Sequence, residues 1–367
     1  MNKVEWGKLG NICVIKTGKL NANAQVENGE YPFFTCDMKP FKIDTFAFDC
    51  EALLLAGNGN IGSVKYYKGK FNAYQRTYVL SDFKNCDARF LYHYLNTFFK
   101  LYIDAKLKKG SVPYITLPLL SDFSVPLISI SAQQKLIKQL DTFTSSIENL
   151  KEQIALRRKQ YEYYRDQLLD LEGKENGDIH SWGEFCQMIK GNGVQKVDFV
   201  DEGRGCIHYG QIYTHYGSYT YDTNRFVSEE VFEKAKKASK GDIIMTDTSE
   251  NVEDICKSVA YLGDEDIAVS NHALIIKHKQ NPKFLSYSTQ TNSFFLQKRK
   301  VVVGVKVSGI KPDHLAQIRI YLPSIEEQQR IVNILDIFEL SIQNLEAQLA
   351  QREKQYEYYR NKLLKFE

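Results

Sequence analysis

The 367 residues are 43% hydrophobic and 25% charged, proportions typical of a globular protein with enough chain for two domains, and no run of about 18 apolar residues predicts a membrane span. The net charge of +3 is too small to indicate nucleic-acid binding by itself. Residues 1–132 carry +5 and residues 173–327 carry −2, so any such binding is expected to be local. Seven widely spaced cysteines without a Cys-x-x-Cys pair argue against a disulfide framework or a zinc site, and predict reduced thiols in a cytoplasmic protein.

Residues 1–127 are predicted to form a mixed α/β domain, because their short alternating apolar runs are broken by Gly, Asn and Asp. Ala52–Leu55 indicates a buried strand, and Ser63–Tyr67 with the turn at Gly69 indicates a hairpin. Between them, Gly57-Asn58-Gly59-Asn60-Ile61-Gly62 matches the spacing of a dinucleotide fingerprint. That fingerprint requires a following helix. Because a strand is predicted instead, we interpret the segment as a glycine-rich hairpin loop.

Residues 128–172 and 323–367 are predicted to form two long helices. Their last 40 positions align without a gap at an offset of 195, and 22 of them are identical. Apolar residues recur at alternating steps of four and three, without Pro or Gly, which predicts coiled-coil helices of roughly 60 Å. Arg157 and Arg352 are the only polar seam positions. The residues expected to face the partner helix are Leu140, Phe143, Ile147, Leu150, Ile154, Tyr161, Tyr164, Leu335, Phe338, Ile342, Leu345, Leu349, Tyr356 and Tyr359.

Neither helix can bury its apolar stripe alone, so the two copies are predicted to pack on each other. Each copy follows a globular segment. An antiparallel pair would therefore place those segments at opposite ends, related by a pseudo-two-fold axis. The alternative is that each helix packs on its own domain or on a different protein.

Residues 173–322 are predicted to form a second mixed α/β domain that repeats the first one faintly. Four pairs of segments carry this match: Trp6-Gly7 with Trp182-Gly183, Ile15-Lys16 with Ile189-Lys190, Ala52–Leu55 with Asp242–Met245, and Tyr74–Leu80 with Ser270–Ile276. The predicted fold class is therefore α/β (α+β), with two globular domains of short mixed strands joined by two long antiparallel coiled-coil helices.

This order of domain, long helix, domain, long helix resembles the specificity subunits of type I restriction-modification systems. The helix signature Lys-Gln-Tyr-Glu-Tyr-Tyr-Arg, at Lys159–Arg165 and Lys354–Arg360, is similar to that family, and so is the lead-in Leu322–Gln329 to the second helix. The lead-in to the first helix departs from the family pattern, with Ile128 in place of a proline. The stretch Gly57–Thr77 is also typical of a target-recognition domain, and the resemblance covers essentially the whole chain.

The resemblance implies a non-catalytic subunit with target-recognition domains at 1–127 and 173–322, each reading one half of a split target in double-stranded DNA. It implies two methyltransferase subunits as partners, with restriction subunits in the full complex, in the cytoplasm of a bacterium or archaeon. It implies no cofactor for this chain. S-adenosylmethionine, ATP and Mg are implied only for the partner subunits.

Catalytic motifs are missing from the sequence. Asn281-Pro282-Lys283-Phe284 is similar to the motif with which amino-methyltransferases grip a flipped base, but Lys283 replaces a proline and no glycine-rich cofactor motif accompanies it. We interpret this segment as a turn before a helix. The histidines lack metal-ligand spacing, and no phosphate-binding loop is present. One alternative, a fused single-chain restriction and methylation enzyme, would need such motifs. The other, a scaffold that has lost DNA reading, is disfavoured because the heads differ while the helices stay alike.

DNA binding requires Lys or Arg for phosphates and polar side chains that reach base edges. The candidates in the first domain are Lys65, Lys68, Lys70, Gln75, Arg76, Lys106, Lys108 and Lys109. The candidates in the second domain are Tyr213, His215, Tyr216, Arg225, Asn271, His272, Lys298, Arg299 and Lys300. Arg76 could instead be a buried structural arginine, and the sequence leaves both possibilities open.

Overall fold

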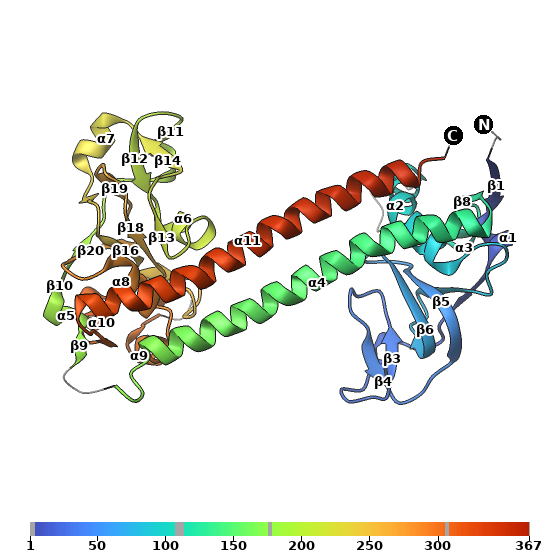
Figure 1. Cartoon of the computed structure of the whole chain (residues 1–367), viewed down its shortest axis with the longest axis horizontal. Helices are drawn as coiled ribbons and strands as arrows, with labels where there is room; N and C mark the ends of the chain where they lie inside the picture. Colours follow the sequence, from blue (N-terminus) through green and yellow to red (C-terminus); the bar gives the residue numbers. More distant parts are fainter. Residues whose placement is uncertain (1–3, 107–113, 175–177, 305–307, 367) are drawn as a thin grey trace. The chain divides into compact units, whose positions relative to one another are not determined.

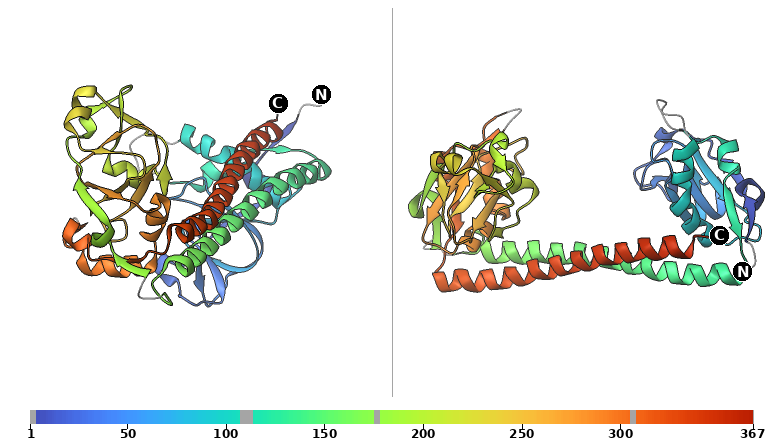
Figure 2. Two further views of the ribbon diagram at one scale, coloured as in Figure 1. Left: turned by 60° about the vertical axis from the view of Figure 1, so that its left-hand side comes forward. Right: turned by 90° about the horizontal axis from the view of Figure 1, so that it is seen from above.

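The computed structural model describes residues 4–106, 114–174, 178–304 and 308–366. Contacts divide the chain into unit 1, residues 1–152 with 346–367, and unit 2, residues 153–345. Each unit holds one globular part and a portion of both long helices, α4 (Ile130–Leu169) and α11 (Ile325–Leu363) (Figure 1 and Figure 2). This division cuts through both long helices. The boundaries predicted from the sequence, 1–127, 128–172, 173–322 and 323–367, instead treat each helix as a separate segment, and they stay a prediction.

The globular part of unit 1 is built on one mixed sheet with the strand order β2-β7-β5-β6-β3-β4. These strands are β2 (Val14–Thr17), β3 (Tyr31–Phe34), β4 (Phe41–Ile43), β5 (Phe48–Ala56), β6 (Val64–Ala73) and β7 (Thr77–Ser81). Around the sheet lie β1 (Glu5–Lys8), which pairs with β8 (Ser124–Leu127), and the helices α1 (Leu9–Ile12), η1 (Ala22–Ala24), α2 (Ala88–Lys106) and α3 (Leu117–Ser121). Apolar residues of α2 pack against the sheet and form the main core of the unit.

The globular part of unit 2 contains a similar sheet with the order β10-β20-β16-β18-β13 and a second sheet with the order β11-β14-β12-β19-β15. The first comprises β10 (Cys186–Lys190), β13 (Tyr219–Thr220), β16 (Ile243–Thr246), β18 (Ser258–Tyr261) and β20 (Ala273–His278). The second comprises β11 (Phe199–Val200), β12 (Arg204–Ile207), β14 (Arg225–Val227), β15 (Lys237–Ala238) and β19 (Ile267–Val269). Short pairs join β9 (Ile179–Ser181) to β22 (Arg319–Tyr321) and β17 (Thr248–Ser249) to β21 (Ser308–Gly309). The helices are α5 (Trp182–Phe185), η3 (Lys196–Asp198), α6 (Tyr209–Thr214), α7 (Glu229–Lys234), α8 (Pro282–Ser288), α9 (Asn292–Val301) and α10 (Pro312–Leu315).

The two globular parts share one framework. The order β2-β7-β5-β6 of unit 1 recurs as β10-β20-β16-β18 in unit 2. Leu53 pairs with Leu80 in unit 1, and Ile243 pairs with Ile276 at the same place in unit 2. All four side chains are buried against the helices of their own unit. The two sequence matches that contain these residues are confirmed, and so is the mixed α/β fold class.

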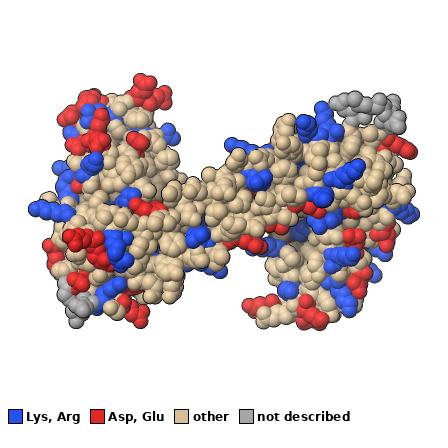
Figure 3. Space-filling view, in the orientation of Figure 1, with Lys and Arg blue, Asp and Glu red and all other residues tan. Residues whose placement is uncertain are grey.

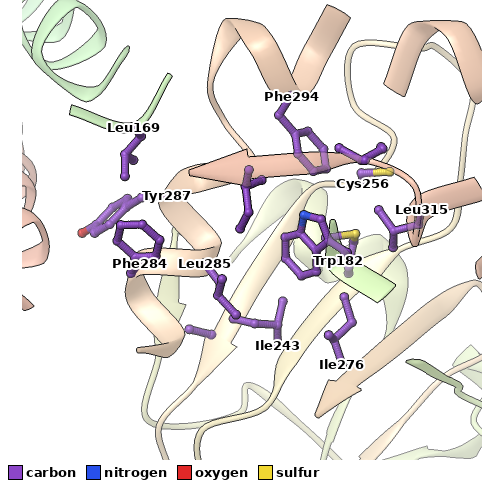
Figure 4. Close-up of a cluster of buried hydrophobic side chains, with 14 of the residues drawn as sticks. Leu169, Trp182, Ile243, Cys256, Ile276, Phe284, Leu285, Tyr287, Phe294 and Leu315 are labelled. Carbon is purple, nitrogen blue, oxygen red and sulfur yellow. The ribbon is translucent and has the colours of Figure 1, made fainter. Parts of the chain in front are cut away.

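The predicted match between Trp6-Gly7 and Trp182-Gly183 is wrong. Trp6 lies on β1 with 46% of its surface exposed, whereas Trp182 begins α5 and is fully buried (Figure 4). The residue that takes the place of Trp182 in unit 1 is Leu9, which begins α1 and is also fully buried. The Leu9 amide donates to the Phe123 carbonyl at 2.9 Å, just as the Trp182 amide donates to that of Ile318 at 3.0 Å.

The match between Ile15 and Ile189 is wrong by one residue. Ile15 pairs with Leu80, whereas the partner of Ile276 is Met188. Because successive side chains of a strand point to opposite faces, a shift of one residue moves the side chain to the other face of the sheet. Met188 packs in the core beside the helices, and Ile189 packs on the opposite side.

The long helices pack on each other within each unit, and they run antiparallel there. In unit 1, Phe143 of α4 stacks on Tyr359 of α11 with ring centroids 5.4 Å apart. Eight residues further along α4, Lys151 forms an ion pair at 3.0 Å with Glu353, six residues earlier in α11. In unit 2, the equivalent Phe338 of α11 stacks on Tyr164 of α4 at 5.4 Å, and Leu169 shares a core with Leu335. The alternative of two separate helices is therefore wrong for both units.

The two polar seam positions also have a structural role in each unit. The Arg352 guanidinium lies 5.9 Å from the centroid of the Phe143 ring, and the Arg157 guanidinium lies 5.9 Å from that of Phe338. A guanidinium can stack on an aromatic face while its donors stay near water, so arginine fits the edge of an apolar seam. Only part of each seam tyrosine packs against the partner helix, because 47% of the Tyr164 surface and 42% of the Tyr359 surface remain exposed.

A buried glutamine near the start of each long helix fixes that helix to its globular part. The Gln133 side chain accepts from the Asp87 amide at 2.7 Å and donates to the Ile128 carbonyl at 2.9 Å. The Gln328 side chain accepts from the Asn281 amide at 3.0 Å and donates to a carbonyl just before α11. Asn281 also caps α8 by accepting from the Phe284 amide, so the segment Asn281–Phe284 forms the N-cap and first turn of this helix and not a turn before it.

A carboxylate eight residues later forms a second attachment in each unit. Asp141 accepts from Arg89 at 3.0 Å and lies 2.9 Å from the ring nitrogen Nε2 of His93, both on α2. The equivalent Asp336 accepts from Lys283 at 2.8 Å and from the Tyr287 hydroxyl at 2.7 Å, both on α8. The repeat therefore extends from the helix sequence to the polar contacts that join each helix to a globular part. No helix in the described part of the chain combines the length and hydropathy that a membrane span needs.

Candidate DNA interface

One end of the unit 1 sheet gathers the central candidates. There β5 ends and β7 begins, and the Gly57 amide donates to the Arg76 carbonyl at 2.8 Å. The Gln75 and Arg76 side chains are exposed and line a pocket of about 500 Å³ with Asn58 and Tyr114, among others. Because the Arg76 side chain is exposed, the alternative of a buried structural arginine is wrong.

The glycine-rich segment beside this pocket is the loop of the β5–β6 hairpin, as predicted from the sequence. Gly59 and Gly62 have φ values of +65° and +88°, a backbone region that favours glycine. The segment leads into strand β6 and not into a helix, so it lacks the context of a dinucleotide fingerprint. Its Asn58 side chain accepts a hydrogen bond from the Cys36 thiol at 3.0 Å, which fixes the loop beside Arg76.

The basic candidates of unit 1 differ in how exposed their side chains are and in the contacts that they already make. Lys65 is half-buried and donates to the Asp37 carbonyl, and burial lowers the pKa of its ammonium. Lys68 and Lys70 are exposed on β6, with the Lys70 ammonium 4.7 Å from the centroid of the Phe46 ring. Lys106 is exposed at the end of α2. Lys108 and Lys109 lie outside the described residues.

The equivalent end of the unit 2 sheet presents a second pocket of about 500 Å³. The Asp247 amide donates to the His272 carbonyl at 3.1 Å, as Gly57 does to Arg76 in unit 1. The Asn271 and His272 side chains are exposed. Tyr213 lines the pocket, but its hydroxyl donates to the Thr248 carbonyl. The structure therefore confirms that Gln75-Arg76 and Asn271-His272 occupy the same place in the two units.

Two DNA-binding candidates of unit 2, Lys298 and Tyr216, are wrong because their side chains are buried in the fold. Only 5% of the Lys298 surface is exposed, and its ammonium donates to the carbonyls of Glu253 and Ile255 at 2.8 and 2.6 Å, so it supports the fold and cannot reach a phosphate in this structure. Tyr216 is buried, and its hydroxyl donates to the Asn224 side chain at 3.1 Å.

The remaining candidates of unit 2 are accessible. His215 is exposed beside the Tyr216 ring, and Arg225 is exposed with its guanidinium 5.9 Å from the centroid of the Phe199 ring. Arg299 and Lys300 are exposed in the last turn of α9. The face in Figure 3 shows Lys and Arg interspersed with Asp and Glu on both units, as expected from the small net charge.

Several pocket residues were missed by the sequence reasoning. They are Asn58 and Tyr114 in unit 1, and Tyr209 and Asn251 in unit 2. Asn58 follows the central strand β5, so position after a central strand is the signal that could have found it, whereas Asn251 follows the short strand β17. Tyr114 and Tyr209 come from distant segments, and nothing local in the sequence places them there.

Thiol and metal chemistry have little support in the described residues. Burial raises the pKa of the Cys13, Cys86, Cys186, Cys206 and Cys256 thiols to about 12, which makes them poor nucleophiles. Within the described ranges, no group of three or more His, Cys, Asp or Glu side chains could hold a metal ion.

Comparisons with known proteins agree on one family. The family model described as "Type I restriction modification DNA specificity domain" matches residues 1–157 and 182–353. The EcoDI specificity subunit of Escherichia coli is 43% identical over 150 residues, an alignment that spans 40% of this chain but only 33% of that protein. The EcoR124I/EcoR124II specificity subunit of Escherichia coli is 25% identical over 321 residues, 82% of this chain and 76% of that one.

Solved structures show the same fold. The S subunit of a type I restriction-modification system from M. genitalium superposes with a TM-score of 0.63 at 17% identity, over 100% of this chain and 97% of that one. A chain from a structure of the complex assembly and conformational transition of the type I R-M system superposes with a TM-score of 0.58 at 15% identity, over 99% of this chain and 97% of that one. Because two repeats of the family model cover most of the residues, the chain belongs to the family of type I restriction-modification DNA specificity subunits.

Proposed function

We propose that this chain reads a bipartite DNA target, with the globular part of each unit contacting one half-site. The observation that carries this proposal is the equivalence of two exposed pairs on one framework. Gln75-Arg76 and Asn271-His272 stand at the same place, directly before the equivalent strands β7 and β20, yet they differ in chemistry. Arg pairs in bidentate fashion with guanine, and Gln or Asn with adenine, so the two half-sites should differ in sequence.

The long helices support the second part of the proposal, in which they set the gap between half-sites and dock two methyltransferase subunits. Tyr163 and Tyr358 occupy equivalent positions just beside the seam, and 61% and 60% of their surfaces are exposed. Exposed aromatic side chains at paired positions fit a protein interface, where tyrosine is enriched. Restriction subunits join the full complex in the cytoplasm. S-adenosylmethionine, ATP and Mg belong to the partners, and this chain is not catalytic.

The test is co-expression of the chain with its methyltransferase partner, followed by mapping of methylated adenines in the host DNA. We expect one motif with two unrelated half-sites and a gap of unspecified sequence. The methyltransferase without this chain should methylate no defined motif, and the purified chain alone should transfer no methyl group from a labelled donor. Methyl transfer by the chain alone, or a motif that does not depend on it, would contradict the proposal.

A further inference from the structure

A buried carboxylate lies behind the candidate reading residue of unit 2. Asp247 directly follows β16, and only 4% of its surface is exposed. One carboxylate oxygen, Oδ2, forms an ion pair with Lys190 of β10 at 3.0 Å. The other oxygen, Oδ1, is buried and has no hydrogen-bond partner among the residues that the structure describes. A buried carboxylate oxygen without a partner costs free energy, so it requires an explanation.

The group that faces this free oxygen is the imidazole of His272. Its Nδ1 atom lies 3.9 Å from Asp247 Oδ1, too long for a hydrogen bond but close enough for one to form after a small rotation of the ring. The His272 side chain is 52% exposed, and the backbone has a φ of +65°. The Tyr209 ring meets the imidazole edge to face at 5.3 Å and limits its movement on one side.

The equivalent position of unit 1 carries no carboxylate. The place of Asp247 is taken by Gly57, and the place of His272 by Arg76, which carries its own permanent charge. Arginine needs no acidic neighbour to stay charged, whereas histidine does at neutral pH. The carboxylate therefore occurs in the unit whose reading residue requires one.

We infer that Asp247 is a positioning residue that holds Nδ1–H of His272 and stabilises the imidazolium, so that Nε2–H donates to a guanine of the half-site read by unit 2. This inference rests on the proposed function. With Nδ1 directed at Asp247, Nε2 is the atom that faces outward, and a protonated ring has donors at both nitrogens. Guanine offers the acceptors N7 and O6 in the major groove. The DNA phosphates add negative potential that favours the charged ring.

The other charged or titratable groups near His272 come from several elements. Lys190 of β10 balances the second oxygen of Asp247, and His208 precedes Tyr209 of α6. Glu250 and Asp254 line the same pocket and add negative charge there. These acidic groups reinforce the effect of Asp247 on the imidazole. They favour a charged ring that donates over a neutral ring that accepts from cytosine or adenine.

The experiment compares variants of the full chain assembled with its methyltransferase subunits. The probes are the duplex found by methylation mapping and copies in which single guanines are replaced by 7-deazaguanine, which lacks the N7 acceptor. His272→Gly removes the imidazole, and glycine tolerates a φ of +65°. Asp247→Asn keeps the size of the side chain, removes its charge and replaces one acceptor oxygen with an amide donor. Asp242→Asn is the matched control, because Asp242 is also buried and forms an ion pair with Lys277 at 2.7 Å in the same sheet.

We expect His272→Gly to weaken binding about tenfold and Asp247→Asn several-fold, with no further loss in the double variant. Wild-type affinity should rise as the pH falls from about 8 to about 6, where histidine gains its proton. Both single variants should abolish this rise, and Asp242→Asn should keep it. Replacing one guanine with 7-deazaguanine should weaken binding by the wild type but not binding by His272→Gly. That guanine should lie in the half-site whose recognition Arg76→Ala does not change.

Two results would overturn the inference while leaving the proposed function intact. One is an Asp247→Asn complex with the wild-type pH dependence. The other is a target in which no guanine position depends on His272. A wild-type complex that binds no DNA sequence specifically would instead overturn the proposed function, and the inference with it.

Discussion

Arg76 is the residue whose environment bears most directly on DNA reading. Its side chain is exposed at a pocket, and its backbone carbonyl accepts from the Gly57 amide, so the backbone position is fixed while the side chain stays exposed. A side chain on a fixed backbone loses little entropy when it binds, which suits it for specific contacts.

Replacing Arg76 with alanine should relax recognition at one half-site only. A lost bidentate contact to guanine costs about 1–3 kcal/mol of discrimination. Methylation mapping of Arg76→Ala should show degeneracy at one base pair of that half-site, with the other half-site unchanged. Arg319→Ala, which removes an exposed arginine of β22, serves as the control. Equal losses at both half-sites would contradict a base-reading role for Arg76.

His93 gives a prediction about acid stability. It is almost fully buried, and burial lowers the pKa of its imidazole, although the adjacent Asp141 acts in the opposite direction. Since the folded state resists protonation, the unfolded state binds more protons as the pH falls below the ordinary histidine pKa of about 6.5. The contribution of His93 to stability is therefore complete above that pH and is lost progressively below it.

The measurement is the urea midpoint of the wild type and of His93→Asn between pH 8 and pH 5, values that bracket the titration of about 6.5. The decline of stability toward acid should be shallower in the variant. It should not vanish, because burial also lowers the pKa of His208 and His278. His215→Asn, at an exposed site, should keep the wild-type slope. An unchanged slope in His93→Asn would exclude this role.

At the scale of elements, the attachment of each long helix to its globular part depends on a few buried polar contacts. Gln133 and Gln328 are 1% and 0% exposed, and each hydrogen-bonds to the segment before a helix of its own unit. Apolar packing favours many orientations of a helix, whereas buried hydrogen bonds are satisfied in few of them. These glutamines therefore specify how each helix begins.

Gln133→Ala should lower the free energy of unfolding by about 1–3 kcal/mol, because it removes a buried side chain and leaves the half-buried backbone amide of Asp87 without this partner. Thermal unfolding of the assembled protein measures this loss. Gln134→Ala, one residue further and exposed, should change it by less than about 0.5 kcal/mol. Equal effects of the two substitutions would show that the buried hydrogen bonds contribute nothing.

At the scale of the whole molecule, the length of the long helices should determine the gap between half-sites. Four added residues advance a helix by about one turn, roughly 6 Å, and DNA rises about 3.4 Å per base pair along one strand. Insertion of four residues into one or both helices should therefore lengthen the unread gap by about one or two base pairs.

Methylation mapping of the insertion variants tests this, and both half-sites should keep their sequence. Alanine substitutions at exposed positions of α4 and α11, which leave the length unchanged, should leave the gap unchanged. Altered half-sites with an unaltered gap would show that the helices do not set the spacing.

The sequence by itself determined the elements whose signals are local or repeated. Heptads over 40 positions define both long helices, because apolar residues at this period form one continuous stripe along a helix. The second copy at an offset of 195 predicted that each helix would meet its repeat, and Phe143 and Phe338 make equivalent contacts. The pairing of Arg76 with His272 also followed from sequence, since each directly precedes a run with the pattern of a strand, Thr77–Leu80 or Ala273–Ile276.

Only the tertiary structure decided the properties that depend on distant segments. It buries Lys298 on two carbonyls of another segment, although its neighbours Arg299 and Lys300 are exposed. It also separates Trp6 from Trp182, because a two-residue similarity says nothing about which element carries it. Asp247 had no signal in its own neighbourhood, since its contacts are with Lys190 at the end of β10 and His272 just before β20, both far away in the sequence. Local patterns record which face of an element is buried, whereas the partner of a buried charge is set by packing between elements far apart in the chain.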